Sequence, residues 1–184
     1  LKSDQVSSLT TTQVAALKNS QITALTPIQI PNLKAEHIVA LTTAQTAILS
    51  PAQTQALKTN QIAAFETEDL VVLQTANIAA LNNIQIVALT TKQVAALRTN
   101  QITALSTSQI SSFENEDIAA LPVSDIAIFT TDQIMAMTTA QVAALTNDEI
   151  TALTDTNIAV LKSDQVSSLT TKQVAALKNS QITA

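Results

Sequence analysis

The stretch LTTKQVAALRTNQITA, residues 89–104, consists of two eight-residue repeats, and the rest of the chain is built from variants of them. The 184 residues divide into 23 such octads with no remainder. Counted from its leading apolar residue, an octad has Leu at position 1 in 19 cases and Ile, Val or Leu at position 6 in 21 cases. Position 5 is Gln in 16 octads, and every Lys, Arg, Asp and Glu lies at positions 2 to 5. Self-similarity at a fixed period identifies a repeat protein.

An eight-residue period excludes one continuous helix. Eight residues at about 100° each advance the helical phase by about 800°, so the apolar residues drift around the cylinder by about 80° in every octad. A coiled coil needs a repeat close to 3.5 or 3.67 residues per turn, and eight residues in two turns are too far from either. The pattern does not alternate as a strand does. The helix must therefore stop and restart in every octad.

Each octad carries its own helix-start signal. Thr90 and Gln93 have the spacing of a capping box, and Leu89 and Val94 have that of a hydrophobic staple. This pattern predicts a short helix over positions 3 to 8, which is too short to be stable alone and must stack on its copies. Because the chain contains no Gly, the corners must avoid left-handed backbone conformations. We therefore expect position 1 or 2 to be extended.

Octads of odd and even number, counted from Leu1, differ in composition. Position 7 is Ala in 9 of 11 even octads and in 1 of 12 odd ones, whereas position 4 is acidic in 7 odd octads and in no even one. The simplest interpretation is that two octads occupy two environments. The sequence thus predicts an all-α solenoid of short helices, one per octad, with two octads (16 residues) per coil.

No linker or composition change divides the chain, so residues 1–184 are predicted to form a single repeat array of 23 octads. Residues 1–24 and 161–184 are identical except for Thr12 against Lys172. Neither end has the polar outer surface of a capping repeat. We expect the sequence to be a slice of a longer repetitive protein.

Three local faults interrupt the pattern. Pro31 falls late in its predicted helix and lacks the N–H that a helix interior needs. Thr46 and Thr54 replace the apolar residue at position 6 in two successive octads. The tract of residues 41–56 is therefore predicted to be the least stable part of the core.

Composition excludes several classes of function. Without Cys there is neither a disulfide nor a thiolate metal site. A net charge of −5, spread along the chain, gives no basic surface for nucleic acid. Apolar runs are too short to span a membrane. A phosphate-binding glycine loop is impossible without Gly.

Octads such as LTTAQVAA, residues 137–144, and LTTKQVAA, residues 89–96, resemble the repeat tracts of very large bacterial cell-surface or secreted adhesin-like proteins. The resemblance covers the whole chain. It implies an extracellular or cell-surface location and a role as a fibre or stalk. The haem use sometimes ascribed to such proteins has no support here, because His37 is the only His and there is no Cys.

Few residues are candidates for chemistry. His37 replaces Gln at position 5 and is interpreted as a substitute making one polar contact, rather than as a metal ligand. The acidic clusters FETED (Glu66, Glu68, Asp69) and FENED (Glu114, Glu116, Asp117) are interpreted as a solvated face, since neither has a calcium-loop pattern. No catalytic, cofactor-binding or metal-binding residue is predicted, and the chain is not expected to be an enzyme.

Two functional hypotheses remain. The first is an extracellular fibre, stalk or filament that self-associates, for which the even-octad Ala at position 7 offers a smooth stripe for side-by-side packing. Alternatively, those small residues allow close helix approach inside one solenoid. The second hypothesis is a solenoid that binds glycan, ice or another surface through Thr rows such as Thr10, Thr11, Thr90, Thr91, Thr170 and Thr171.

Overall fold

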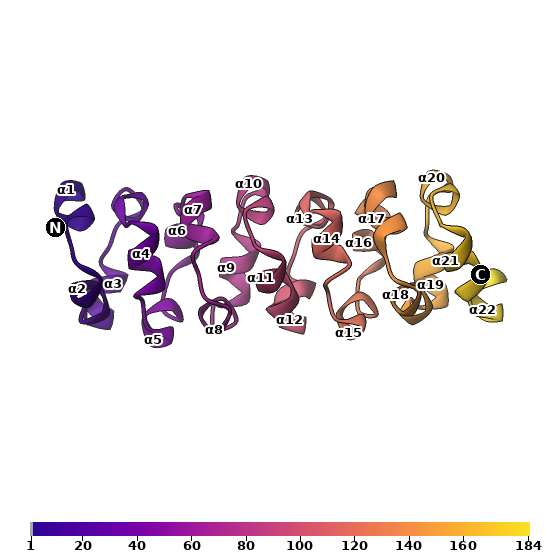
Figure 1. The fold of residues 1–184 in the computed structure, drawn as a ribbon, viewed down its shortest axis with the longest axis horizontal. Helices are drawn as coiled ribbons and strands as arrows, with labels where there is room; N and C mark the ends of the chain where they lie inside the picture. Colours follow the sequence, from indigo (N-terminus) through magenta and orange to yellow (C-terminus); the bar gives the residue numbers. More distant parts are fainter. Residues whose placement is uncertain (1) are drawn as a thin grey trace. The chain divides into compact units, whose positions relative to one another are not determined.

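A computed structural model describes residues 2–184, and within them the chain is all-helical, with 22 short α-helices, one 3₁₀ helix and no strand (Figure 1). One helix falls in each octad, as the sequence predicts. The chain divides into two compact units, Leu1–Ala104 and Leu105–Ala184, each built from the same repeat. The predicted all-α solenoid of short helices is confirmed.

The first unit contains α1 (Ser3–Ser7), α2 (Thr11–Ala15), α3 (Asn19–Thr23), η1 (Ile30–Asn32), α4 (Ala35–Val39), α5 (Thr43–Thr46), α6 (Pro51–Gln55), α7 (Thr59–Ile62), α8 (Thr67–Leu70), α9 (Thr75–Ala79), α10 (Asn83–Val87), α11 (Thr91–Ala96) and α12 (Thr99–Thr103). The second unit contains α13 (Thr107–Ser112), α14 (Asn115–Ile118), α15 (Val123–Ile126), α16 (Thr131–Ala136), α17 (Thr139–Ala144), α18 (Asn147–Ala152), α19 (Asp155–Ala159), α20 (Ser163–Ser167), α21 (Thr171–Ala176) and α22 (Asn179–Ile182).

The capping box predicted for Thr90 and Gln93 forms at the start of α11. The Thr90 hydroxyl accepts a hydrogen bond from the Gln93 N–H (3.3 Å), and the Gln93 Oε1 accepts one from the Thr90 N–H (2.8 Å). The next corner is extended at both positions, with ψ of 141° at Leu97 and 153° at Arg98. No described residue has a positive φ. Glycine is dispensable because every corner uses backbone angles open to any residue.

The octad of residues 25–32 departs from the others. Its regular segment is the 3₁₀ helix η1 over Ile30–Asn32, with Pro31 inside it. Pro has no N–H to continue an α-helical ladder. The fault predicted at Pro31 is therefore present, although Ile30 still reaches the core.

The size of the coil differs from the prediction of 16 residues. Stacked helices within a unit are three octads apart, as for α8 with α11 and α15 with α18. Hydrogen bonds from Gln61 Nε2 reach the carbonyls of Leu33 and Ile30, which precede Gln61 by 28 and 31 residues. One turn thus takes between three and four octads, and the prediction of two octads per coil is wrong.

The physical reason is that successive octads are equivalent steps of a screw. Each step keeps position 5 toward the preceding turn and position 6 toward the following one, so the turn need not close on a whole number of octads. An octad therefore stacks on neighbours of both parities. The odd–even alternation of the sequence has no counterpart in this arrangement, and we find no physical account of it.

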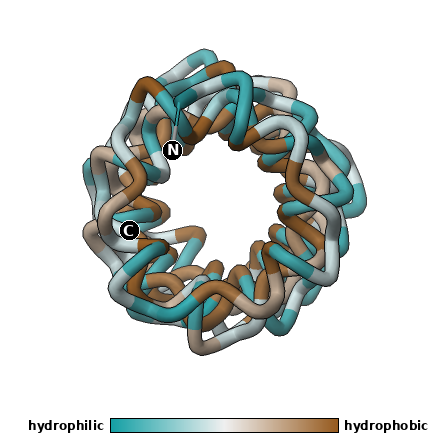
Figure 2. The backbone as a smooth tube through the Cα atoms, turned by 90° about the vertical axis from the view of Figure 1, so that its left-hand side faces the viewer, coloured by the Kyte–Doolittle hydropathy of each residue, from teal (hydrophilic) through white to brown (hydrophobic). Residues whose placement is uncertain are grey.

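The core runs between consecutive turns. Away from the ends of the units, positions 1, 5 and 6 are buried in nearly every octad, and positions 2 to 4 are mostly exposed. Positions 7 and 8 are exposed or half-buried. Figure 2 shows the resulting alternation of apolar and polar stretches along the winding backbone. Each helix thus has a charged or hydroxylic start at the surface and a partly exposed end.

Candidate functional site

The repeated Gln at position 5 holds each turn to the one before it. Gln141 is typical. Its Oε1 accepts the N–H of Thr138 at the helix start (2.8 Å), and its Nε2 donates to the carbonyls of Ile110 and Phe113 (both 2.8 Å). The last two bonds satisfy backbone carbonyls buried between turns, which would otherwise cost about 1–3 kcal/mol each. The Gln at position 5 therefore has a structural role, since one side chain bonds the start of its own helix and the backbone of the preceding turn.

His37 makes one of the two kinds of hydrogen bond that Gln makes at position 5: it accepts the N–H at the helix start but donates to no carbonyl within residues 2–184. Its ring is fully buried, and Nδ1 accepts the N–H of Lys34 (3.1 Å) just as a Gln Oε1 does. Nε2 has no hydrogen-bond partner within residues 2–184, and it lies 3.9 Å from a carboxylate oxygen of Glu36. This arrangement matches a Gln substitute with one polar contact.

The acidic clusters split between two environments. Glu66 and Glu68 are exposed, but Asp69 is buried at position 5. Burial, together with the charges of Glu66 and Glu68, raises the pKa of Asp69 from 3.8 to about 6. The same division holds for Glu114, Glu116 and the buried Asp117. The expected solvated face thus consists of the glutamates alone.

No group of three or more His, Cys, Asp or Glu side chains that could hold a metal ion occurs among residues 2–184. Glu149 shows which hydrogen bond an acidic side chain at position 5 makes in this fold. Its Oε2 accepts the N–H of Thr146 (2.6 Å), so that a carboxylate replaces the amide oxygen of Gln at the helix start.

Threonines at position 2 are engaged in the fold. The hydroxyl of Thr10 accepts the N–H of Gln13 (3.2 Å), and that of Thr170 accepts the N–H of Gln173 (3.2 Å). Both side chains are exposed, as are the neighbouring Thr11 and Thr171. Thr11 and Thr171, at position 3, do not cap their helices, and their side chains face solvent.

The even-octad alanines at position 7 lie near the partly exposed ends of their helices. They are exposed or half-buried, as for Ala79 and Ala95. Even octads follow one another two steps apart, whereas stacked octads are three or four steps apart. Octads four steps apart share parity and octads three steps apart do not, so both interpretations made from the sequence stay predictions.

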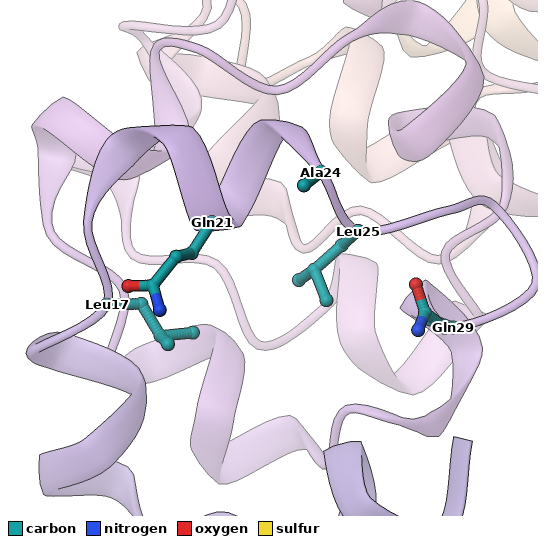
Figure 3. A pocket seen from close by; sticks show the side chains of 5 residues that line it. All are labelled: Leu17, Gln21, Ala24, Leu25 and Gln29. Atoms are coloured by element: carbon teal, nitrogen blue, oxygen red, sulfur yellow. The ribbon is translucent and has the colours of Figure 1, made fainter. Parts of the chain in front are cut away.

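The first three octads differ from the interior in a way that the sequence does not signal. Gln5, Gln13 and Gln21 are exposed, because no preceding turn covers them within residues 2–184. A pocket of about 180 Å³ lies beside Gln21, lined also by Leu17, Ala24, Leu25 and Gln29 (Figure 3). Periodicity alone cannot reveal this surface, since it depends on which neighbours an octad has.

Comparison with known proteins supports a repeat tract. The ALTTAQ repeat family matches residues 62–99, 110–147 and 118–155, which together cover less than half of the chain. These segments are similar to that repeat. No curated protein matches the chain significantly. Within residues 2–184, none of the helices is both long and apolar enough to cross a membrane.

Proposed function

We propose that this chain is a structural repeat protein of an extracellular fibre, stalk or filament, with no enzymatic activity. The observation that carries the proposal is the ladder of Gln side chains, which joins each turn to the preceding one through buried hydrogen bonds. Because each repeat packs only on its neighbours, further turns can be added without changing the core of those already present. The extracellular location is supported by the resemblance of the octads to adhesin-like repeat tracts.

A second candidate is binding to a glycan, ice or another extended surface through exposed hydroxyls. Exposed Thr side chains at position 3, such as Thr11, Thr91 and Thr171, favour it. The Thr at position 2 favours it less, since its hydroxyl already caps a helix.

Negative-stain images of the chain at rising concentration test the proposal. Filaments or bundles that lengthen with concentration are the expected result. Monodisperse particles that bind ice or immobilised glycans would support the second candidate instead. A matched variant with Thr11, Thr91 and Thr171 changed to Lys separates the two, because it removes the hydroxyl surface and leaves the caps intact.

A further inference from the structure

Charged side chains occur along the whole chain, but their signs are segregated. Between Arg98 and Lys162 the sequence holds eight acidic residues and no Lys or Arg. We call residues 99–161 the acidic segment. Residues 2–65 hold four Lys and two acidic residues, and we call them the basic segment. The basic segment belongs to the first unit, and nearly all of the acidic segment belongs to the second.

The exposed charges of both segments lie outside the contacts between turns. In the acidic segment the exposed carboxylates are at positions 2 to 4 of their octads: Glu114, Glu116, Asp132, Asp148 and Asp155. In the basic segment every Lys is exposed and lies at position 2: Lys2, Lys18, Lys34 and Lys58. Positions 2 to 4 are mostly exposed even in octads that have a turn on both sides, so further octads at either end would leave these side chains exposed.

The charges are hardly paired within the fold. Among residues 2–184, Lys34 and Glu36 form the one ion pair between a Lys or Arg side chain and a carboxylate, with 3.3 Å between Nζ and Oε1. The acidic segment contains no Lys or Arg that could pair with its exposed carboxylates. Each segment therefore keeps a net charge of its own sign at its surface.

Stacking of the helices brings like charges to neighbouring turns. Helix α16 packs on α19, so the exposed Asp132 and Asp155 lie on stacked helices. Helix α4 packs on α7, and Lys34 and Lys58 are the residues that precede these two helices. A surface that carries one sign of charge over successive turns attracts a surface of the opposite sign, over a distance set by the ionic strength.

The chain itself carries the complementary surface. Lys2 and Lys18 recur as Lys162 and Lys178, at an offset of 160 residues, so the acidic segment lies between two stretches that carry Lys. Two copies aligned without a shift would set like segments together, which like-charge repulsion disfavours. A shift by about half of this long repeat sets the acidic segment of one copy beside a basic segment of the other.

We propose that copies of this chain associate side by side, with the acidic segment of one copy against the basic segment of another. This inference rests on the proposed fibre role and specifies which surfaces join the copies. An exposed ion pair strengthens an association by about fivefold at most. Several pairs must therefore form together, and dissolved salt weakens the contact by screening them.

One triple variant reverses the charge of the acidic segment. Glu116→Lys, Asp132→Lys and Asp148→Lys all change position 4, where Lys92 and Lys172 already stand, so the fold accepts the new side chains. The three changes move the net charge from −5 to +1. A net charge nearer to zero by itself favours association. Pairing of the segments predicts the opposite, which is a loss of at least about tenfold in the association constant.

A second triple variant reverses the basic segment. Lys2→Glu, Lys18→Glu and Lys58→Glu change the residue before a helix, a place that Glu66 and Glu114 occupy before α8 and α14. This variant alone should also lose association by at least about tenfold. An equimolar mixture of the two triple variants should associate again, because one copy then carries mainly exposed Lys and the other mainly exposed carboxylates.

The control is Glu66→Lys with Glu68→Lys, which moves the net charge from −5 to −1 without touching the acidic segment. Sedimentation velocity over a range of protein concentrations, at salt concentrations of about 0.01 M and about 0.3 M, compares all the proteins. The unchanged chain and the control should grow in mass with concentration at low salt and dissociate at high salt. Circular dichroism checks that every variant keeps its helices.

Three results would overturn the pairing of segments. Association of the acidic-segment variant as strong as that of the unchanged chain, or association that high salt leaves intact, would show that other surfaces join the copies and would leave the fibre role standing. A chain that stays monomeric at low salt would contradict side-by-side association altogether. If that monomer binds polylysine, the acidic segment serves a cationic partner instead of a second copy, and the fibre role is then restricted to a single unbundled stalk.

Discussion

Residues 2–24 and 161–184 have nearly the same sequence, yet they are buried on opposite sides. Their helices begin at equivalent residues: α1 spans Ser3–Ser7 and α20 spans Ser163–Ser167, while α3 begins at Asn19 and α22 at the equivalent Asn179. Burial does not agree. Val14 is fully buried and Gln13 exposed, whereas Val174 is half exposed and Gln173 buried.

The comparison separates what an octad encodes from what its neighbours decide. The helix starts follow from residues within the octad and are the same in both places, whereas the ends of α2 and α21, and those of α3 and α22, differ by one residue. Burial of position 5 requires a preceding turn, and burial of position 6 requires a following one. Hydrophobicity at position 6 therefore stabilises the chain only where another turn covers it.

The largest effect is expected from placing a charge at position 6. Val14→Asp and Val94→Asp should lower the free energy of unfolding by about 3–5 kcal/mol, because an unpaired carboxylate would be buried. Val174→Asp changes the same residue of a near-identical octad and should cost less than about 0.5 kcal/mol, as at other exposed sites. Urea unfolding followed by circular dichroism at low protein concentration measures all three. Equal losses would show that burial is not decided by the neighbouring turn.

At position 5 the larger loss of stability is expected in residues 161–184 and the smaller one in residues 2–24. Gln165→Ala removes one bond to the Lys162 N–H and two to the carbonyls of Ile134 and Met137. It should cost about 3 kcal/mol, since buried backbone groups are left unpaired. Gln5→Ala removes the single bond to the Lys2 N–H and should cost about 1 kcal/mol. The two variants are compared by urea unfolding, and a larger loss from Gln5→Ala would contradict the ladder.

An acid at a covered position 5 makes stability depend on pH. The pKa of Asp69 is raised from 3.8 to about 6 by burial and by the charges of Glu66 and Glu68. A raised pKa means that the folded chain favours the protonated carboxyl. The stabilising effect of protonation is complete below about pH 4 and is lost as the pH rises through about 6.

Asp69→Asn should therefore stabilise the chain by about 3 kcal/mol above pH 7 and have little effect near pH 4. Asn77, in the next octad, shows that the shorter amide can still donate, since its Nδ2 bonds the carbonyl of Leu49 (2.8 Å). Thermal unfolding of both proteins between pH 4 and 8 gives the answer. A constant difference across that range would mean that Asp69 ionisation is not linked to folding.

Much of this architecture follows from local sequence. Capping residues at position 2, Gln at position 5 and the absence of Gly are enough to predict short helices with extended corners, one per octad. The size of the coil is different, because it depends on how far each corner rotates the next helix. That rotation comes from backbone angles and packing, which all octads share, so no residue pattern reports it.

The candidate surfaces divide in the same way. The ladder role of Gln could be predicted, because Gln recurs where backbone groups need partners. The exposure of Gln13 and Val174 could not be predicted, since the octad of residues 89–96, which is identical or nearly identical to theirs, carries the same two residues in covered settings. The sequence groups Asp69 with a solvated acidic face because three of the five residues in FETED are acidic. The octad position, rather than the cluster, decided its burial.

The smallest effects are expected at the two threonines that interrupt position 6. Both are fully buried, but their hydroxyls differ: the Thr54 hydroxyl accepts a hydrogen bond from Asn77 Nδ2 (2.7 Å), while the Thr46 hydroxyl has no partner within residues 2–184. Thr46→Val keeps the shape and removes an unpaired buried hydroxyl, so it should stabilise the chain by about 1 kcal/mol. Thr54→Val removes a bonded one and should destabilise by about 1 kcal/mol, because the Asn77 amide loses an acceptor. Chemical unfolding of the two variants, with hydrogen exchange of residues 41–56, measures both. Opposite signs would show that the cost of a polar residue in this core is set by its partner in the neighbouring turn, and equal signs would mean that only the lost apolar surface counts.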